Sequence, residues 1–171
     1  DEIRLSLRLA ERRNYDLSFS FSLLARQKDI RTSNLPITKM ENRWQYRIHY
    51  IKTLGRGVEW RSRAQVNRYG FLQNSVSWMV YQELKFKPVG SSFSITSRIA
   101  RYAIQNFDSR IYTYEVRAGN RFAFPAFNGN GYRFFINLKY TWKQFRIGLY
   151  LGTQSETSTN SNMSLSLRWK V

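Results

Sequence analysis

The sequence predicts an all-β fold of about ten antiparallel strands, and three observations carry this prediction. Apolar side chains recur at every second position along most of the chain, as in Leu5, Leu7 and Leu9. A period of two is typical of a strand whose faces meet different surroundings, whereas a helix repeats about every 3.6 residues. Turn-forming stretches such as "LGRG" and "FNGNG" separate the alternating segments. The chain has only 3 prolines, and none interrupts an alternation.

About ten segments show the alternation. They cover residues 3–9, 17–23, 43–50, 58–67, 75–86, 93–99, 112–117, 132–142, 145–151 and 163–171. With their flanking residues they are long enough to cross a bilayer as strands, which takes about 9–11 residues each. The stretch "LGRG" is a turn signal and "TWKQ" predicts a tight periplasmic turn, while "FPAFNGNG" and "TQSETSTNSN" predict extracellular loops. The stretch 27–42 is long and fits the strand count badly, so we expect an inward plug, a partner contact or a further strand there.

Composition narrows the function classes. The 171 residues suffice for one domain, and no cysteine is present to form a disulfide or a thiolate metal site. The single histidine, His49, makes a Ser-His-Asp triad or a histidine metal cluster improbable. We therefore predict no catalytic residues, no metal site and no cofactor. Mean hydropathy is −0.53, and no apolar run approaches the roughly 20 residues of a membrane helix.

Alternating strands occur in soluble barrels, which bury their apolar face, and in outer-membrane barrels, which turn it toward lipid. Here the residues of the apolar phase nearly all have large side chains. In the segment 132–142, Tyr and Trp lie at the ends. Nearly every strand acid falls on the polar phase, as expected if charge is excluded from lipid. These features favour an antiparallel transmembrane (outer-membrane type) β-barrel or barrel sector of about ten strands. The alternative is a soluble lipocalin-like ligand-binding barrel.

The polar phase carries the candidate functional residues. The chain has 28 Lys and Arg against 11 Asp and Glu, a formal net charge of +17. The predicted lumen-lining basic residues are Arg4, Arg8, Arg47, Arg61, Arg63, Arg98, Arg133, Lys139, Arg146, Arg168 and Lys170. Glu59, Glu83 and Glu115 lie among bases of the same phase, which favours salt-bridged lining over tuned general acids. A cation-rich lumen attracts anions or an acidic plug.

The apolar phase carries a predicted aromatic girdle, the belt of amphipathic rings that membrane barrels place at the headgroups. Its candidates are Trp44, Tyr50, Trp60, Trp78, Tyr132, Tyr140, Trp142 and Trp169. The implied partners are the lipid bilayer with its lipopolysaccharide, and other outer-membrane proteins or an acidic plug. Nucleic acid is an improbable partner, because the bases are spread over every strand instead of forming one patch.

The stretch "DSRIYTYEVRAGNRFAFPAFNGNGYRFFINLKYTW" resembles the C-terminal β-barrel segment of a family of large Bacteroidota outer-membrane proteins. That family is known for a helix-hairpin-helix region similar to competence-type DNA-uptake proteins. The matching elements are residues 110–115, 125–127, 128–131 and 132–135, and the resemblance covers roughly residues 91–171. It implies a location in the bacterial outer membrane of a Gram-negative organism. The helix-hairpin-helix region has no counterpart here, so no DNA-related role is implied.

These observations lead to one expectation and two alternatives. Residues 1–171 form a single outer-membrane β-barrel domain, either a whole barrel or the C-terminal part of a longer one. The expected function is a passive or partner-gated, porin-like pore whose basic lumen favours anions in transport. The first alternative is a structural or assembly scaffold in an outer-membrane protein complex, and the second is the soluble ligand-binding barrel.

Overall fold

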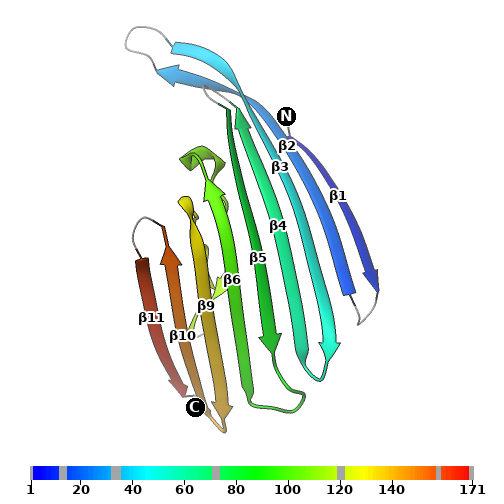
Figure 1. Cartoon of the computed structure of the whole chain (residues 1–171), viewed down its shortest axis with the longest axis vertical. Helices are drawn as coiled ribbons and strands as arrows, with labels where there is room; N and C mark the ends of the chain where they lie inside the picture. Colours follow the sequence, from blue (N-terminus) through cyan, green and yellow to red (C-terminus); the bar gives the residue numbers. More distant parts are fainter. Residues whose placement is uncertain are drawn as a thin grey trace.

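The computed structural model describes residues 2–11, 15–31, 36–70, 74–118, 122–156 and 159–169. It is all-β, as predicted: an antiparallel nine-stranded sheet in the order β1-β2-β3-β4-β5-β6-β9-β10-β11, with a separate two-stranded sheet of β7 and β8. The large sheet is a single curved layer (Figure 1). A short 3₁₀ turn, η1 (Phe107–Ser109), follows β6. None of the helices in this part of the chain is long and apolar enough to cross a membrane.

The strands of the large sheet are long. They are β1 (Glu2–Glu11), β2 (Tyr15–Arg31), β3 (Pro36–Gly55), β4 (Val58–Gly70), β5 (Asn74–Phe86), β6 (Phe93–Ile104), β9 (Gly129–Trp142), β10 (Phe145–Ser155) and β11 (Thr159–Trp169). Neighbouring strands in this order pair antiparallel throughout. The shortest of them, β1, has 10 residues, which meets the length of about 9–11 residues that a membrane-spanning strand requires.

The large sheet is open. Its edges are β1 and β11, and these two strands do not pair in the described part of the chain. Across nine antiparallel strands the direction alternates, so β1 and β11 run the same way, as Figure 1 shows. The two edges therefore cannot meet as an antiparallel pair. The described residues thus form an open sheet and not a closed barrel.

Two hairpin turns, between β3 and β4 and between β9 and β10, contain residues with positive φ. In "LGRG", Arg56 and Gly57 connect β3 to β4 with φ angles of 49° and 82°. Positive φ at both central residues defines the type I′ turn, which matches the twist of paired strands. In "TWKQ", Lys143 and Gln144 connect the cross-strand partners Trp142 and Phe145, with φ 50° at Lys143. Both stretches are turns, as predicted, and "TWKQ" is the tight connection expected there.

The segment 112–117 is not a strand of the large sheet, and that prediction is wrong. Ile104 at the end of β6 pairs directly with Gly129 at the start of β9. Residues 105–128 thus leave the sheet as one excursion, which we call the inner segment. It contains η1 and the short strands β7 (Glu115–Val116) and β8 (Phe122–Ala123). The predicted loop "FPAFNGNG" likewise divides: its last three residues already belong to β9.

The stretch 27–42 extends the hairpin of β2 and β3. The pairing of these strands continues to Arg31 and Pro36, whereas β1 ends opposite Leu24 and β4 ends opposite Asn42. The ribbon therefore projects past its neighbours at the end of the sheet (Figure 1). The predicted inward plug is wrong for the described part of this stretch, since strand pairing continues, and the partner contact stays a prediction.

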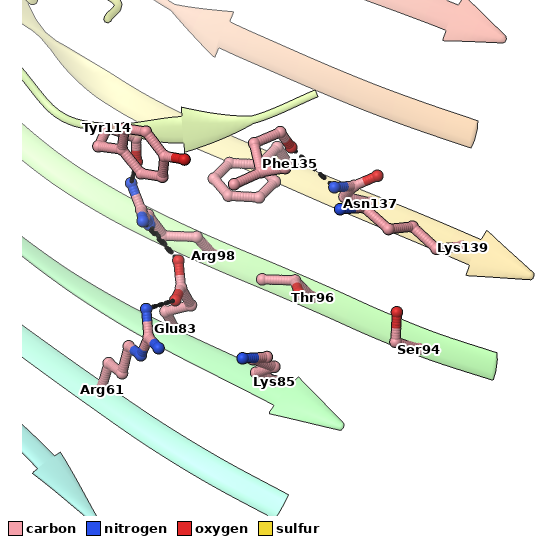
Figure 2. Close-up of a pocket in the computed structure, with 11 residues that line it drawn as sticks. Arg61, Glu83, Lys85, Ser94, Thr96, Arg98, Tyr114, Phe135, Asn137 and Lys139 are labelled. Carbon is pink, nitrogen blue, oxygen red and sulfur yellow. Dashed lines mark hydrogen bonds and ion pairs between the residues drawn. The ribbon is translucent and has the colours of Figure 1, made fainter. Parts of the chain in front are cut away.

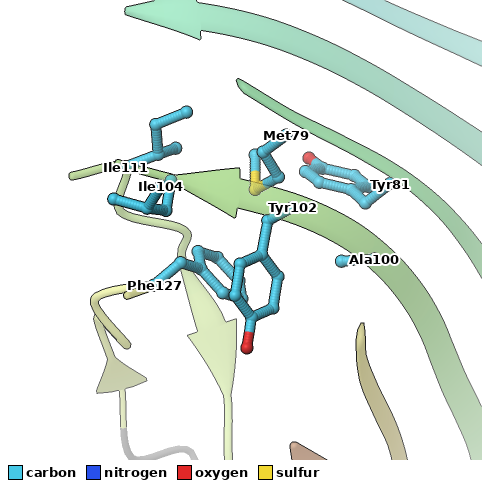
Figure 3. Packing of buried hydrophobic residues seen from close by; sticks show 7 residues of the cluster. All are labelled: Met79, Tyr81, Ala100, Tyr102, Ile104, Ile111 and Phe127. Carbon is cyan, nitrogen blue, oxygen red and sulfur yellow. The ribbon is translucent and has the colours of Figure 1, made fainter. Parts of the chain in front are cut away.

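The hydrophobic core lies between the sheet and the inner segment. Met79, Tyr81, Ala100, Tyr102 and Ile104 project from β5 and β6, and Ile111 and Phe127 approach from the inner segment (Figure 3). The ring centroids of Tyr102 and Phe127 lie 4.6 Å apart. This core fixes the inner segment on one face of the sheet, which we call the inner face.

Candidate functional site

Burial in this protein is inverted relative to a soluble sheet. Along β5 exposed and buried residues alternate, and four of the six exposed ones are the large apolar residues Val76, Trp78, Val80 and Leu84. The buried residues between them include Ser77 and Glu83, with exposed fractions of 0% and 4%. The exposed phase is thus largely apolar, whereas the buried phase under the inner segment combines polar residues with the core residues Met79 and Tyr81. We call the opposite, apolar side the outward face.

Polar contacts hold the inner segment on the inner face. Asn67 Nδ2 of β4 donates to the backbone oxygen of Arg110 at 3.2 Å, and the hydroxyls of Ser77 and Ser109 are 2.6 Å apart. Arg98 Nη1 donates to the carbonyl of Tyr114 at 2.9 Å. Because Asn67, Ser77 and Arg98 belong to strands of the large sheet, the inner segment is hydrogen-bonded to that sheet.

Asn137 adds a fourth anchor beside Arg98. Its Nδ2 donates to the carbonyl of Val116 at 2.7 Å, two residues beyond the carbonyl that Arg98 holds. Both side chains reach the same edge of β7, from β6 and β9. The backbone of β7 is therefore fixed against the sheet by side chains, although it shares no ladder with the large sheet.

Several acids of the inner face are engaged with arginine. Glu83 accepts from Arg98, with Nε at 2.9 Å and Nη2 at 2.5 Å, and Arg61 Nη1 lies 3.4 Å from its other oxygen (Figure 2). Glu59 lies 2.5 Å from Arg61 Nε. The predicted salt-bridged lining is confirmed for these carboxylates.

The most buried ion pair joins the sheet to the inner segment. Arg133 of β9 meets Glu115 of β7 through two parallel bonds of 2.6 and 2.8 Å. The exposed fractions of the two side chains are 6% and 1%. Tyr150 donates its hydroxyl to Glu115 at 3.0 Å. Bidentate geometry of this kind gives the strongest charge-assisted hydrogen bonds.

The register places the described basic candidates on the inner face. Arg8 and Arg63 occupy the same cross-strand row as Arg133, and Arg146 lies directly opposite Arg168. Arg47 and Arg63 both bond the side-chain oxygen of Gln65. Lys170 lies outside the described residues.

The inner segment covers only part of the inner face. Arg98 and Arg133 are buried beneath it, whereas Arg4 and Arg8 on the edge strand β1 have side chains 72% and 70% exposed. Arg4 pairs with Glu2 at 2.8 Å and Arg8 with Asp16 at 2.5 Å. The inner face is therefore filled near β6 and β9 and open near β1.

The girdle candidates lie on the outward face. Trp142 and Trp169, the last residues of β9 and β11, stack on either side of Phe145 with centroid distances of 6.2 Å each. Tyr50 and Trp60 meet edge to face at 5.8 Å. The remaining candidates on the same face are Trp44, Trp78, Tyr132 and Tyr140. The outward cation Arg101 lies 4.0 Å from the centroid of the Tyr132 ring.

A pocket of about 180 Å³ opens where the inner segment ends over the sheet. Its walls include Lys85 and Lys139, with Ser94, Thr96 and Asn137 between them (Figure 2). Sequence reasoning did not find this pocket or the anchors Asn67, Ser109 and Tyr150. Their signal is weak, because isolated polar residues on an alternating strand do not reveal what covers them. Among the described residues, no group of His, Asp and Glu could hold a metal ion.

Comparison with known proteins adds no family assignment. No family model, curated protein or solved structure matches this chain.

Proposed function

We propose that this chain forms part of the wall of an outer-membrane β-barrel, with its outward face in lipid and its inner face lining an interior that favours anions. The observation that carries the proposal is the inverted burial. Ile48, Val80 and Leu84 are 45%, 42% and 47% exposed, while Glu83 and Arg98 are buried. In water such an arrangement forfeits about 25 cal/mol for each Å² of apolar surface left uncovered. Lipid removes that cost.

Strand length and backbone pairing also support a membrane wall. A strand crosses a bilayer only if every backbone group is bonded within a sheet, and the inner strands of this sheet pair on both sides. A soluble lipocalin-like barrel would bury Val80 and Leu84 and expose Glu83. The observed burial is the reverse, which argues against the soluble alternative.

The preference for anions follows from the charges of the inner face. Glu59, Glu83 and Glu115 are each bonded to an arginine. Arg47, Arg63, Arg146 and Arg168 add positive charge to the same face. An interior lined in this way raises the local concentration of anions.

A scaffold role in an outer-membrane complex is the second candidate, and one observation favours it. The inner segment is bonded to β4, β5, β6, β9 and β10 and occupies interior space that a permeant would need. Small barrels of about eight strands already have interiors filled by side chains. A wall filled in this way serves as an anchor for partner proteins without any permeant.

Planar-bilayer conductance separates the two candidates. For a pore, we expect current whose reversal potential in a salt gradient indicates anion preference. Charge reversal at Arg47→Glu with Arg63→Glu should lower that preference, while Lys143→Glu in the β9–β10 turn serves as the control. Absence of current from correctly inserted protein would overturn the pore and leave the scaffold. Failure to insert into lipid at all would overturn both.

A further inference from the structure

Two arginines of the inner face meet on one uncharged oxygen atom. Arg47 of β3 donates from Nε to Gln65 Oε1 at 3.2 Å, and Arg63 of β4 donates to the same oxygen from Nη2. Because both donors contact one acceptor, the two guanidinium groups lie close together. Like charges at such short range repel each other, and an anion that contacts both groups offsets this repulsion.

The carboxylates nearest to this pair in the sheet register are bonded to other arginines. Asp16 and Glu83 lie one cross-strand row from Arg63, and each accepts from a different arginine at 2.5 Å. In the described part of the chain, the ion pairs of the inner face involve Arg4, Arg8, Arg61, Arg98 and Arg133. Arg47 and Arg63 contact an amide oxygen instead. The pair therefore carries two positive charges that no carboxylate of the described residues contacts.

A chain of polar contacts fixes the shared acceptor. Gln65 is 4% exposed, and its Nε2 donates to Asn67 Oδ1 at 2.9 Å. Asn67 in turn donates to the backbone oxygen of Arg110 in the inner segment at 3.2 Å. Because the amide nitrogen of Gln65 is used by Asn67, its oxygen is directed at the two arginines. The pair is therefore held together by the protein itself, before any anion binds.

The pair lies beside the open part of the inner face. Ser20 of β2 lies directly opposite Arg47, and Ser6 of the edge strand β1 lies opposite Ser20. Serine side chains are short, so they leave space beside Arg47, and the inner segment is bonded to β4 and the strands beyond it. The Nη1 and Nη2 atoms of Arg47 donate no hydrogen bond to the described residues. Both atoms can therefore donate to a ligand in this space.

Two buried nitrogen atoms of this cluster have no hydrogen-bond partner among the described residues. They are Arg63 Nε and His49 Nε2, and His49 lies directly opposite Arg63 in the β3–β4 register. A buried polar atom that is left unpaired is destabilising. An oxyanion carries several acceptor oxygens, so its entry beside Arg63 offers acceptors to the donors of this cluster.

We propose that Arg47 and Arg63 bind a phosphate group, as inorganic phosphate or as a phosphate monoester, with the hydroxyl of Ser20 beside it. The inference deepens the proposed function and rests on it for the route by which a solute reaches the inner face. Two guanidinium groups carry two positive charges, which the doubly charged form of a phosphate group matches and a single carboxylate does not. Guanidinium groups also bind phosphate oxygens through paired N–H donors.

The test is equilibrium binding of inorganic phosphate to the full chain in detergent micelles, measured by titration calorimetry at low chloride and slightly alkaline pH. Pore activity is not needed for this measurement, so its failure and a failure of the conductance experiment are distinguishable. The Arg47→Gln/Arg63→Gln variant should bind phosphate at least about tenfold more weakly, because charge-assisted hydrogen bonds are lost. Arg146→Gln removes an arginine of the same face on β10, away from the pair, and should bind like the original chain.

Gln65→Glu tests the site with both arginines in place. It puts a carboxylate of nearly the same shape on the oxygen that Arg47 and Arg63 already contact. The internal carboxylate then takes the position of the anion's charge, so phosphate affinity should again fall at least about tenfold. Circular dichroism checks that the strand content is unchanged. This variant keeps the proposal falsifiable even if the double glutamine variant folds poorly.

The choice of ligand completes the test. Glycerol phosphate that competes with inorganic phosphate would support a site for phosphate monoesters, and binding of inorganic phosphate without such competition would support a site for the inorganic ion. Acetate that binds as tightly as phosphate would overturn the assignment to a phosphate group. Unchanged affinity in the double variant or in Gln65→Glu, an equal loss in Arg146→Gln, or no binding of millimolar phosphate to the original chain would each overturn the proposal.

Discussion

Arg133 and Glu115 form a buried, two-bonded ion pair that connects β9 to the inner segment, with Nε–Oε1 and Nη2–Oε2 distances of 2.6 and 2.8 Å. The two residues belong to different sheets, and their bond is the strongest polar contact between them. A buried charge without its partner is costly, because the remaining ion has lost its water. This pair therefore contributes to holding the inner segment on the sheet, beside the core and the other polar anchors.

We expect Glu115→Ala to release the inner segment. Breaking a buried ion pair costs about 3–5 kcal/mol, which raises the undocked fraction by about 100-fold or more. Limited trypsin digestion measures this, because Arg110 and Arg117 lie in the segment. Glu2→Ala, which breaks the exposed pair with Arg4, is the control and should leave the cleavage rate unchanged. Equal rates for the two variants would show that the ion pair does not anchor the segment.

Gly57→Ala should destabilise the β3–β4 turn more than Gly90→Ala destabilises the β5–β6 loop. Both glycines have positive φ, 82° and 74°, and each alanine pays about 1–2 kcal/mol for that conformation. At Gly57 an added Cβ would also lie 2.0 Å from the backbone oxygen of Lys87, whereas at Gly90 nothing lies within 4 Å. Denaturant midpoints of the two variants in the same micelles measure the difference. Equal midpoints would contradict the close approach of Lys87.

Ile48→Arg tests whether the outward face meets lipid. Ile48 lies in the middle of β3 and is 45% exposed. An arginine on the lipid face near the bilayer midplane costs about 2–4 kcal/mol, whereas a substitution on a water-exposed surface usually changes stability by about 0.5 kcal/mol or less. The free energy of unfolding, measured in lipid vesicles, distinguishes a lipid-facing surface from a water-exposed one. Val89→Arg, at a loop residue that is 92% exposed, is the control. A cost at position 48 no larger than at position 89 would place this face in water.

Replacing residues 105–128 by Asn-Gly should raise single-channel conductance if the chain forms a pore. Ile104 and Gly129 are cross-strand partners, so a two-residue type I′ turn can join β6 to β9 without changing their register. The replacement empties the inner face above β5, β6 and β9. We expect lower stability, because Ile111 and Phe127 leave the core, together with a larger current. Unchanged current from inserted protein would mean that the inner segment does not narrow the path.

The sequence by itself determined the strand character and the two faces. Side chains of a strand alternate strictly, so the phase that carries Val76, Trp78 and Val80 had to lie opposite the phase that carries Ser77 and Glu83. The pairing of Glu59 and Glu83 with arginine was also readable, because same-phase neighbours share a face, whereas Glu115 reaches Arg133 from outside the large sheet. The turn between β3 and β4 was readable from Gly55 and Gly57, because glycine adopts the positive φ that such turns require.

Only the tertiary structure decided which alternating segments enter the large sheet. Residues 112–117 carry the same period of two as a sheet strand, yet Ile104 pairs with Gly129 and excludes them. Strand pairing is a long-range choice between partners of similar local pattern, so periodicity cannot decide it. The same holds for the extended pairing of β2 with β3 beyond Leu24 and for the open edges at β1 and β11. The Lys85–Lys139 pocket likewise exists only because β7, far along the chain, is bonded to Arg98 and Asn137.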